Sequence, residues 1–146
     1  MIDNYFALEP VIVEALKSNI PEIETIHTPF NIEEMLGMTN EEVALSVIYF
    51  DDRVGDEAAR GRVSIIHQQW LVVLSLREAS SQLQSTNEIR KKAEPYIQMI
   101  LKTMQGLDSK LAGSRPFKRV SSPVRSGGKS SFFYIPFMFE AQLIIG

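Results

Sequence analysis

The stretch VSIIHQQWLVVLSL, residues 63–76, decides the fold because apolar side chains occupy both of its faces. Read with the two-residue period of a β-strand, one face carries mainly Ile66, Trp70, Val72, Leu74 and Leu76, and the other carries Val63, Ile65, Leu71 and Val73. A strand that exposes one face to water alternates apolar and polar residues, so this pattern predicts a strand that is covered on both sides.

A second long strand precedes this stretch. Residues 42–50 alternate with the same period, and the charged segment 51–62, which contains Gly55 and Gly61, is predicted to be a solvated hairpin loop between the two strands. At about 3.3 Å per residue, residues 63–76 would span roughly 46 Å, so this strand can overhang its own domain.

Two helices are indicated before the first long strand. Residues 3–18 place apolar side chains near helical spacing, and Pro10 is expected to mark either a kink or the beginning of the helix. The segment NIEEMLGM, residues 31–38, places Asn31 three residues before Glu34. This is the spacing of a capping box, and it predicts a short helix.

A third helix and a final hairpin follow the long strands. Residues 89–104 show the clearest amphipathic pattern in the chain and predict a long helix. The segments 116–124 and 130–145 then flank RSGG, residues 125–128, which predicts a hairpin whose glycines adopt positive φ. Pro136 has no N–H to donate, so the last strand is expected to lie at a sheet edge or to carry a bulge.

Together with a short strand at residues 23–28, these elements predict one domain, residues 1–146, of the α+β class. We expect a single antiparallel or mixed sheet of about four to five strands, with the two main helices packed on one face. Two helices cover only one side of strands this long, so another subunit is the expected cover for the remaining apolar surface. The rival arrangement is a curled sheet that closes on itself.

The composition narrows the class of protein. The chain has 146 residues, of which 45% are hydrophobic, and it has no cysteine, so disulfides, thiolate metal sites and cysteine nucleophiles are excluded. No apolar run reaches the roughly 18 residues of a membrane helix, and the N-terminus lacks the pattern of a signal peptide. We therefore expect a soluble protein, made in the cytosol, without membrane contact.

Charge is divided unevenly along the sequence. Residues 1–60 hold 13 acidic and 3 basic side chains, a balance of −10, whereas residues 61–146 hold 5 acidic and 12 basic ones, a balance of +7. This division is either ordinary surface charge or a sign of head-to-tail contact between identical subunits, in which a positive patch meets a negative one.

No catalytic motif stands out in the sequence, so we expect a protein that is not an enzyme and that binds no cofactor. His27 and His67 lack a partnering signature and are interpreted as structural or surface residues. The loop 51–62 gathers four acids, Asp51, Asp52, Asp56 and Glu57. They do not follow the calcium-loop pattern, so a solvated turn is favoured, and a small enzyme with a Mg²⁺ or Ca²⁺ site stays as the alternative.

The segment 115–129 is basic and holds no acid. SGGKSS, residues 126–131, does not make a phosphate loop, because Pro123 stands where the motif requires glycine and a strand follows. The basic residues of the segment are Arg115, Lys118, Arg119, Arg125 and Lys129. They favour a water-exposed hairpin over a direct nucleic-acid contact, since no aromatic stacking platform lies among them.

Four stretches of the chain resemble the tail terminator, or tail completion, proteins of long-tailed bacteriophages and related prophages. They are VEALKSNIP (13–21), HQQWLVVLSL (67–76), IRKKAEPYIQMILKTMQGL (89–107) and SGGKSSFFYIPFMFEAQL (126–143). The resemblance covers nearly everything from Tyr5 to Leu143. It implies a structural virion protein that forms a ring of six copies on the end of the tail tube, stops tube polymerisation and offers a docking surface to the head or neck.

The resemblance also implies the partners. These are further copies of the chain, the tail tube protein, a neck or head-completion protein, the sheath terminus if the tail contracts, and DNA only as it passes through the lumen. The resemblance also implies that the protein lies at the neck-proximal end of the virion tail and is assembled in the host cytoplasm. The alternatives are another neck or tail adaptor protein, or a small nucleic-acid-binding module that uses the basic hairpin 115–129.

Contact residues are chosen from the physics of this sequence, because the family offers no sharp motif. The predicted subunit-interface residues are apolar or aromatic: Trp70, Val72, Leu74, Phe132, Tyr134 and Met138. The predicted contacts with axial partners or with DNA in the channel are charged: Asp51, Asp52, Arg53, Asp56, Glu57, Arg115, Lys118, Arg119, Arg125 and Lys129.

Overall fold

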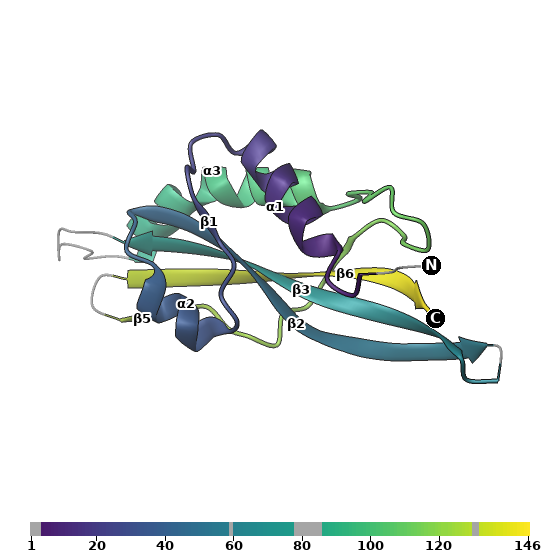
Figure 1. Ribbon diagram of the computed structural model, residues 1–146. Coiled ribbons are helices and arrows are strands. Elements are labelled where there is room, and N and C mark those ends of the chain that lie inside the picture. The colour runs from purple at the N-terminus through teal and green to yellow at the C-terminus, as the bar shows by residue number, and fades with distance from the viewer. Residues whose placement is uncertain (1–3, 59, 78–85, 130–131) are drawn as a thin grey trace.

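The computed structural model describes residues 4–58, 60–77, 86–129 and 132–146, with the side chains of all of these except 56–58, 86 and 129. The described residues form three helices and six strands (Figure 1). In chain order these are α1 (Leu8–Asn19), β1 (Ile26–His27), α2 (Ile32–Met38), β2 (Val43–Ala58), β3 (Val63–Arg77), α3 (Thr86–Met104), β4 (Lys118–Val120), β5 (Gly127–Lys129) and β6 (Phe132–Ile145).

The strands form one mixed sheet in the order β1-β2-β3-β6-β4, and β5 also pairs with β6. β1 runs parallel to β2, and the other pairs are antiparallel. The predicted α+β class and mixed sheet are confirmed. The sheet has more strands than predicted, because the segment between α3 and β6 contributes two short strands, β4 and β5, rather than one.

Both faces of the sheet are covered by the chain itself. α1 and α3 pack on one face, where Trp70 and Val72 belong to the larger core (Figure 1). On the opposite face, Met35 of α2 joins Leu71 in a smaller core, and Val124 from the connection between β4 and β5 packs against it. The second cover that the sequence analysis assigned to another subunit is therefore supplied largely from within the chain.

The long hairpin is more regular than predicted. β3 agrees with the strand predicted at residues 63–76, but β2 continues through the charged segment and pairs with β3 as far as Ala58 opposite Val63. The prediction of a solvated loop over residues 51–62 was wrong for most of that range. Pairing with β3 holds these charged residues in a strand, because cross-strand contacts decide strand formation more than intrinsic propensity does.

The predicted start of the short helix α2 is confirmed, and the predicted start of α1 is not. α2 begins as expected, since the Oδ1 atom of Asn31 accepts a hydrogen bond from the backbone N of Glu34 at 2.8 Å. α1 begins at Leu8 rather than at residue 3, and its N-cap, Ala7, makes no side-chain cap bond. Pro10 thus falls in the first turn, where its missing N–H is not needed.

The glycines of the predicted final turn lie in β5 instead. Gly127 pairs with Tyr134 and Gly128 with Phe133, and a β-carbon on either glycine would come 2.5 Å from the aromatic side chain opposite. Neither glycine has positive φ, so the predicted reason for them was wrong: they permit close approach of the rings.

The expectation that Pro136 would place the last strand at a sheet edge or at a bulge was wrong, because β6 lies between β3 and β4 and its register with β3 is continuous. β5 pairs with residues 132–134 and β4 with residues 138–140, so neither of them pairs with Pro136.

Candidate assembly surfaces

The residues predicted for the subunit interface lie almost entirely inside the chain. Their exposed fractions are 0% for Trp70, Val72 and Leu74, 1% for Met138 and 7% for Phe132, and Tyr134 is partly exposed. Helices and the β4–β5 connection cover these side chains, so they have little apolar area to offer another copy. A strand pattern reports that a face is covered, without saying whether the cover is the same chain or a neighbour. Tyr134 is the member of the set with surface left to contribute.

The indole N–H of Trp70 is hydrogen-bonded within the chain. Its Nε1 donates to Oε1 of Gln68 at 2.8 Å, and Nε2 of Gln68 donates to the carbonyl oxygen of Tyr5 at 2.9 Å. Gln68 has no exposed surface. A buried polar group is tolerated where it is hydrogen-bonded, and here it ties the segment before α1 to the centre of the sheet.

Two of the predicted axial residues meet at one buried carboxylate. Oε2 of Glu140 lies 3.2 Å from Nη2 of Arg53 and 3.8 Å from Nζ of Lys118, and Nε2 of Gln69 donates to Oε1 at 3.2 Å. Nδ1 of His67 is 3.7 Å away. Burial would raise the pKa of Glu140, but the hydrogen bonds from Arg53 and Gln69 and the charges of Arg53 and His67 hold that pKa below its usual value. Arg53 and Lys118 are thus engaged within the chain.

The remaining basic candidates stay at the surface. The side chains of Arg115, Arg119 and Arg125 are exposed. The guanidinium of Arg119 lies 5.3 Å from the centroid of the Phe137 ring, which favours its position over the aromatic face. The side chain of Lys129 lies outside the described part of the structure. The three arginines remain available to a negatively charged partner.

The acidic candidates of the hairpin differ in environment. Asp51 is exposed, whereas Asp52 is partly buried, and this burial raises the pKa of its carboxyl group. Oδ1 of Asp52 has no hydrogen-bond partner in the described structure. The side chains of Asp56 and Glu57 lie outside the described part. Asp51 is therefore the acid of this group with the clearest surface position.

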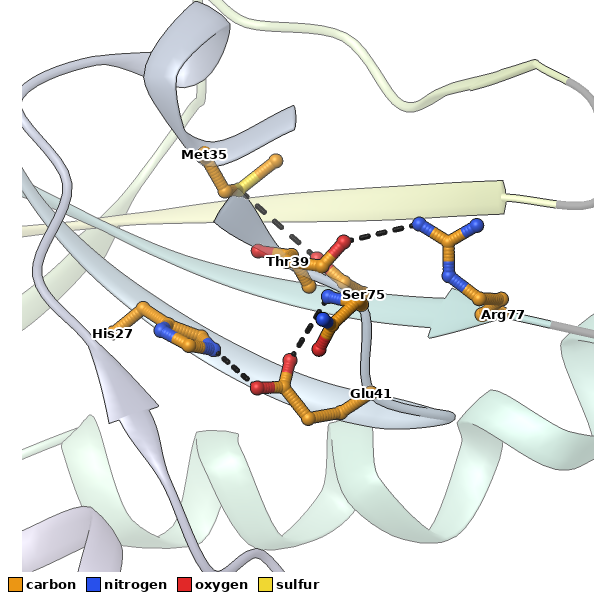
Figure 2. A network of polar contacts seen from close by, with 7 residues as sticks. His27, Met35, Thr39, Glu41, Ser75 and Arg77 are labelled. Carbon is orange, nitrogen blue, oxygen red and sulfur yellow. Dashed lines mark hydrogen bonds and ion pairs between the residues drawn. The ribbon is translucent and has the colours of Figure 1, made fainter. Parts of the chain in front are cut away.

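A polar network joins the end of α2 to the start of β2 (Figure 2). Nε2 of His27 and Oε1 of Glu41 are 2.8 Å apart, and Nη2 of Arg77 donates to the carbonyl oxygen of Thr39 at 3.0 Å. Burial works to raise the pKa of Glu41, but backbone hydrogen bonds and its contact with His27 hold it below the usual value. His27 therefore has a partner within the fold that fixes β1 beside the beginning of β2.

The two edges of the sheet differ in how they are covered. The outer side of β6 is covered by β5 and β4 and then by the segment before β4, where the backbone N of Arg115 donates to the carbonyl of Gln142 and the backbone N of Ile144 donates to the carbonyl of Gly113. The outer side of β2 pairs with β1 at Leu45 and Ser46. Beyond this point no described strand pairs with it. One edge of the sheet is therefore formed by the long strand β2 with the two-residue β1, and the other by the short strands β4 and β5 beside β6.

An apolar groove of about 830 Å³ lies beside β2 where β1 leaves it. Four aromatic side chains line it: Phe6 before α1, Phe30 before α2, and Tyr49 and Phe50 in β2. Ile48 and Leu71 line it as well. This groove could not be predicted from the sequence, because each phenylalanine that precedes a helix stands far from Phe50 along the chain. No local pattern brings them together before the sheet forms.

Among the described residues, no three His, Asp or Glu side chains are grouped so that they could hold a metal ion. Asp51 and Asp52, considered above as cation ligands, are consecutive in β2, and consecutive strand residues point to opposite faces of a sheet. No helix in the described part of the chain is long and apolar enough to span a membrane.

Comparison with known proteins gives a match along the whole sequence. A family model described as phage tail terminator protein matches residues 1–146, which include the helices, the sheet and both of its edges. A search of curated proteins finds no match. The family match agrees with the resemblance carried by the four stretches of sequence quoted above. The chain therefore belongs to the phage tail terminator family, with a structural role in completing the bacteriophage tail, where it contacts other tail components.

Proposed function

We propose that six copies of the chain form a ring on the head-proximal end of the tail tube, stop its polymerisation and give the neck or head a docking surface. The observation that supports this proposal best is that the two sheet edges are unlike: one is formed by the long strand β2 with the short β1, and the other by the short strands β4 and β5. A contact between unlike surfaces is heterologous, and it closes into a ring when the rotation between copies allows it.

Such a ring would stop tube growth by its shape. One of its faces would match the end of the tube, and the other would differ from it, so that no further tube subunit could add. We propose that Asp51 on the β2–β3 hairpin and the exposed arginines Arg115, Arg119 and Arg125 contact these axial partners or the DNA in the lumen. Oppositely charged surfaces accelerate and orient such contacts.

The proposed role is structural rather than catalytic, and it uses no cofactor. The partners are further copies of the chain, the tail tube protein, a neck or head-completion protein and, in a contractile tail, the sheath terminus. The ring would be assembled in the host cytoplasm and kept in the virion. No membrane takes part in this proposal.

Deletion of the gene tests the proposed function. We expect tails from the deletion phage to carry tubes of uncontrolled length without attached heads, as measured by negative-stain electron microscopy. Expression of the wild-type chain should restore tubes of uniform length with heads. Tubes of normal length with heads in the deletion phage would contradict the proposal.

One observation favours a second candidate function. The segment 115–125 exposes Arg115, Arg119 and Arg125 and contains no acid, which suits phosphate contacts. A nucleic-acid-binding module would bind duplex DNA in a filter-binding assay, and its affinity would fall steeply with salt and with Arg→Ala substitution at these positions. Binding that does not depend on salt or on these arginines would reject this candidate.

A further inference from the structure

The groove beside β2 lies at a strand edge that can still accept a partner. β1 leaves β2 after Ser46, and the β2–β3 ladder is irregular between Tyr49 and Asp51. Residues 47–49 are therefore a short regular stretch whose outer side has no partner strand in the described part of the chain. Open strand edges bind extended segments of other chains through backbone hydrogen bonds.

Aromatic rings surround this open stretch. Phe6, which precedes α1, packs edge to face on Tyr49 with 5.1 Å between ring centroids. Phe30 and Phe50 line the same groove. The exposed fraction of Phe30 is 82%, that of Phe6 is 47% and that of Phe50 is 40%. Apolar surface is stabilised when it leaves water, and aromatic side chains are frequent anchors of protein interfaces, so these rings are suited to burial by a partner.

The groove is acidic as well as aromatic. Glu9, Glu33 and Glu34 line it, and none of the described residues that line it is basic. Glu33 and Glu34 are exposed, and Glu9 is partly exposed. Complementary charge selects the partner at such a surface, so the occupant is expected to be positively charged.

The other edge of the same sheet carries the complementary charge. The segment RPFKRV, residues 115–120, exposes Arg115, Lys118 and Arg119 and contains no acid. It includes β4, a strand of 3 residues that pairs with β6 and lies at the end of the strand order. The outer side of β4 therefore has no partner strand in the described structure, like the outer side of β2 across the sheet.

We propose that residues 115–120 of one copy occupy the groove beside β2 of the next copy, with β4 alongside residues 47–49. In this contact Arg115 and Arg119 face the carboxylates of the groove, while Lys118 stays beside Glu140 of its own chain, and Phe30 and Phe50 are covered. The inference rests on the ring proposed above and names its lateral contact. Because the two surfaces lie at opposite edges of the sheet, each copy fills the groove of one neighbour and receives the other neighbour in its own.

Cross-linking in assembled tails tests the contact directly. The chain has no cysteine, so introduced cysteines report a single contact. The deletion phage is complemented with two single-cysteine copies, Phe30→Cys with an affinity tag and Arg119→Cys without one, and the purified tails are treated with a short bis-maleimide. Since each copy has one cysteine, no bond can form within a chain. The expected product is a dimer of one tagged and one untagged chain.

The matched control places the first cysteine elsewhere on the same copy. Glu22 is exposed and lies outside the residues that line the groove, so tagged Glu22→Cys with untagged Arg119→Cys should give no mixed dimer. A product with Glu22→Cys as strong as the product with Phe30→Cys would overturn the proposed contact. The absence of any mixed dimer between Phe30→Cys and Arg119→Cys would overturn it too.

Charge reversal gives a second test. One double variant, Glu33→Arg with Glu34→Arg, reverses the charge of the groove, and another, Arg115→Glu with Arg119→Glu, reverses the charge of the segment that fills it. Each double variant should lower the yield of complete phage about tenfold or more. All four substitutions in one chain should restore the yield, which a folding defect would not allow. The matched control is Glu22→Arg with Glu24→Arg, at two exposed acids outside the groove, and it should leave the yield unchanged.

The same phage strains separate this inference from the proposed function. If the deletion phage makes tails of normal length with heads, the proposed function is wrong. If its tails are overlong and the wild-type chain corrects them, but the charge-reversed chains correct them equally well and no mixed dimer forms, the proposed function stands and the groove contact is overturned.

Discussion

Nη2 of Arg53 lies 3.2 Å from Oε2 of Glu140, although 87 residues separate the two in the chain. The pair links the distal half of β2 to β6 across the intervening strand β3. Lys118 of β4 approaches the same carboxylate, so one buried acid holds the long hairpin and the β4 edge of the sheet together. This relationship adds to the β2–β3 pairing that holds the charged hairpin segment in a strand.

Replacing the buried acid should destabilise the fold. Glu140→Gln keeps the shape of the side chain but removes the charge that Arg53 and Lys118 face. We expect the free energy of unfolding to fall by about 1–3 kcal/mol, less than for a fully enclosed pair, because both cations keep contact with water. Urea denaturation measures the change.

Glu42→Gln is the matched control for Glu140→Gln. Glu42 is exposed, and its carboxylate pairs with Lys92 at 2.9 Å on the surface. Surface ion pairs contribute little to stability, so the urea midpoint of Glu42→Gln should equal that of the wild type. Equal midpoint shifts in the two variants would show that Glu140 has no special role.

Stability should depend on pH through Glu140. Its pKa in the folded state is held below the usual 4.5, so the folded state binds this proton less readily than the unfolded state does. The resulting stabilisation is fully present above pH 4.5 and is lost as the pH falls through the folded-state pKa. Urea midpoints measured from neutral to acidic pH should therefore fall more steeply for the wild type than for Glu140→Gln. Parallel pH curves would contradict this assignment.

Two glycine-to-alanine substitutions should have opposite effects. Gly106 follows α3 with a φ of +80°, and alanine there should cost about 1–2 kcal/mol of stability, because a β-carbon strains that conformation. Gly37 lies inside α2, and no neighbouring atom lies within 4 Å of the position that a β-carbon would take, so alanine there should stabilise the fold by about 0.5–1 kcal/mol. Thermal unfolding followed by circular dichroism measures both, and changes of equal sign would count against the backbone argument.

The fluorescence of the single tryptophan should report folding and not assembly. Trp70 has no exposed surface in the isolated chain, so its emission should already be blue-shifted and protected from acrylamide before any ring forms. Assembly should leave both properties unchanged. A blue shift or a gain in protection on assembly would instead show that Trp70 lies in the subunit interface, as the strand pattern predicted.

Some elements could be predicted from the sequence because their signals are local. β3 and α3 have long, regular apolar periods, and the cap of α2 rests on two residues three positions apart. The distal half of β2 could not be predicted, because its charged residues are typical of a loop until β3 pairs with them and Glu140 partners Arg53.

The segments that cover the second face of the sheet were equally hard to predict from the sequence. It comes from Met35 of a short helix and from Val124 of an irregular connection, neither of which has a strong pattern of its own. An apolar strand face therefore predicted a cover correctly but not its source. The same limit applies to the buried polar residues: Gln68 and Glu140 interrupt apolar strands, and such interruptions are the signal that could have marked them as partners of buried groups.

The candidate surfaces were predictable only in their charge. The uneven division of acidic and basic residues along the chain corresponds to opposite edges of the sheet, with Glu33 and Glu34 near β2 and Arg115 and Arg119 near β6. The groove beside β2 forms from side chains that are distant in sequence, so it could be recognised only in the folded structure.

Electron cryomicroscopy of purified tails tests the central claim most directly. The proposed ring predicts six copies of this α+β domain around the lumen at the head-proximal end of the tube, each with β2 beside the β4 edge of its neighbour. Copies distributed along the tube, or a terminal density that cannot hold a closed ring of this domain, would contradict it.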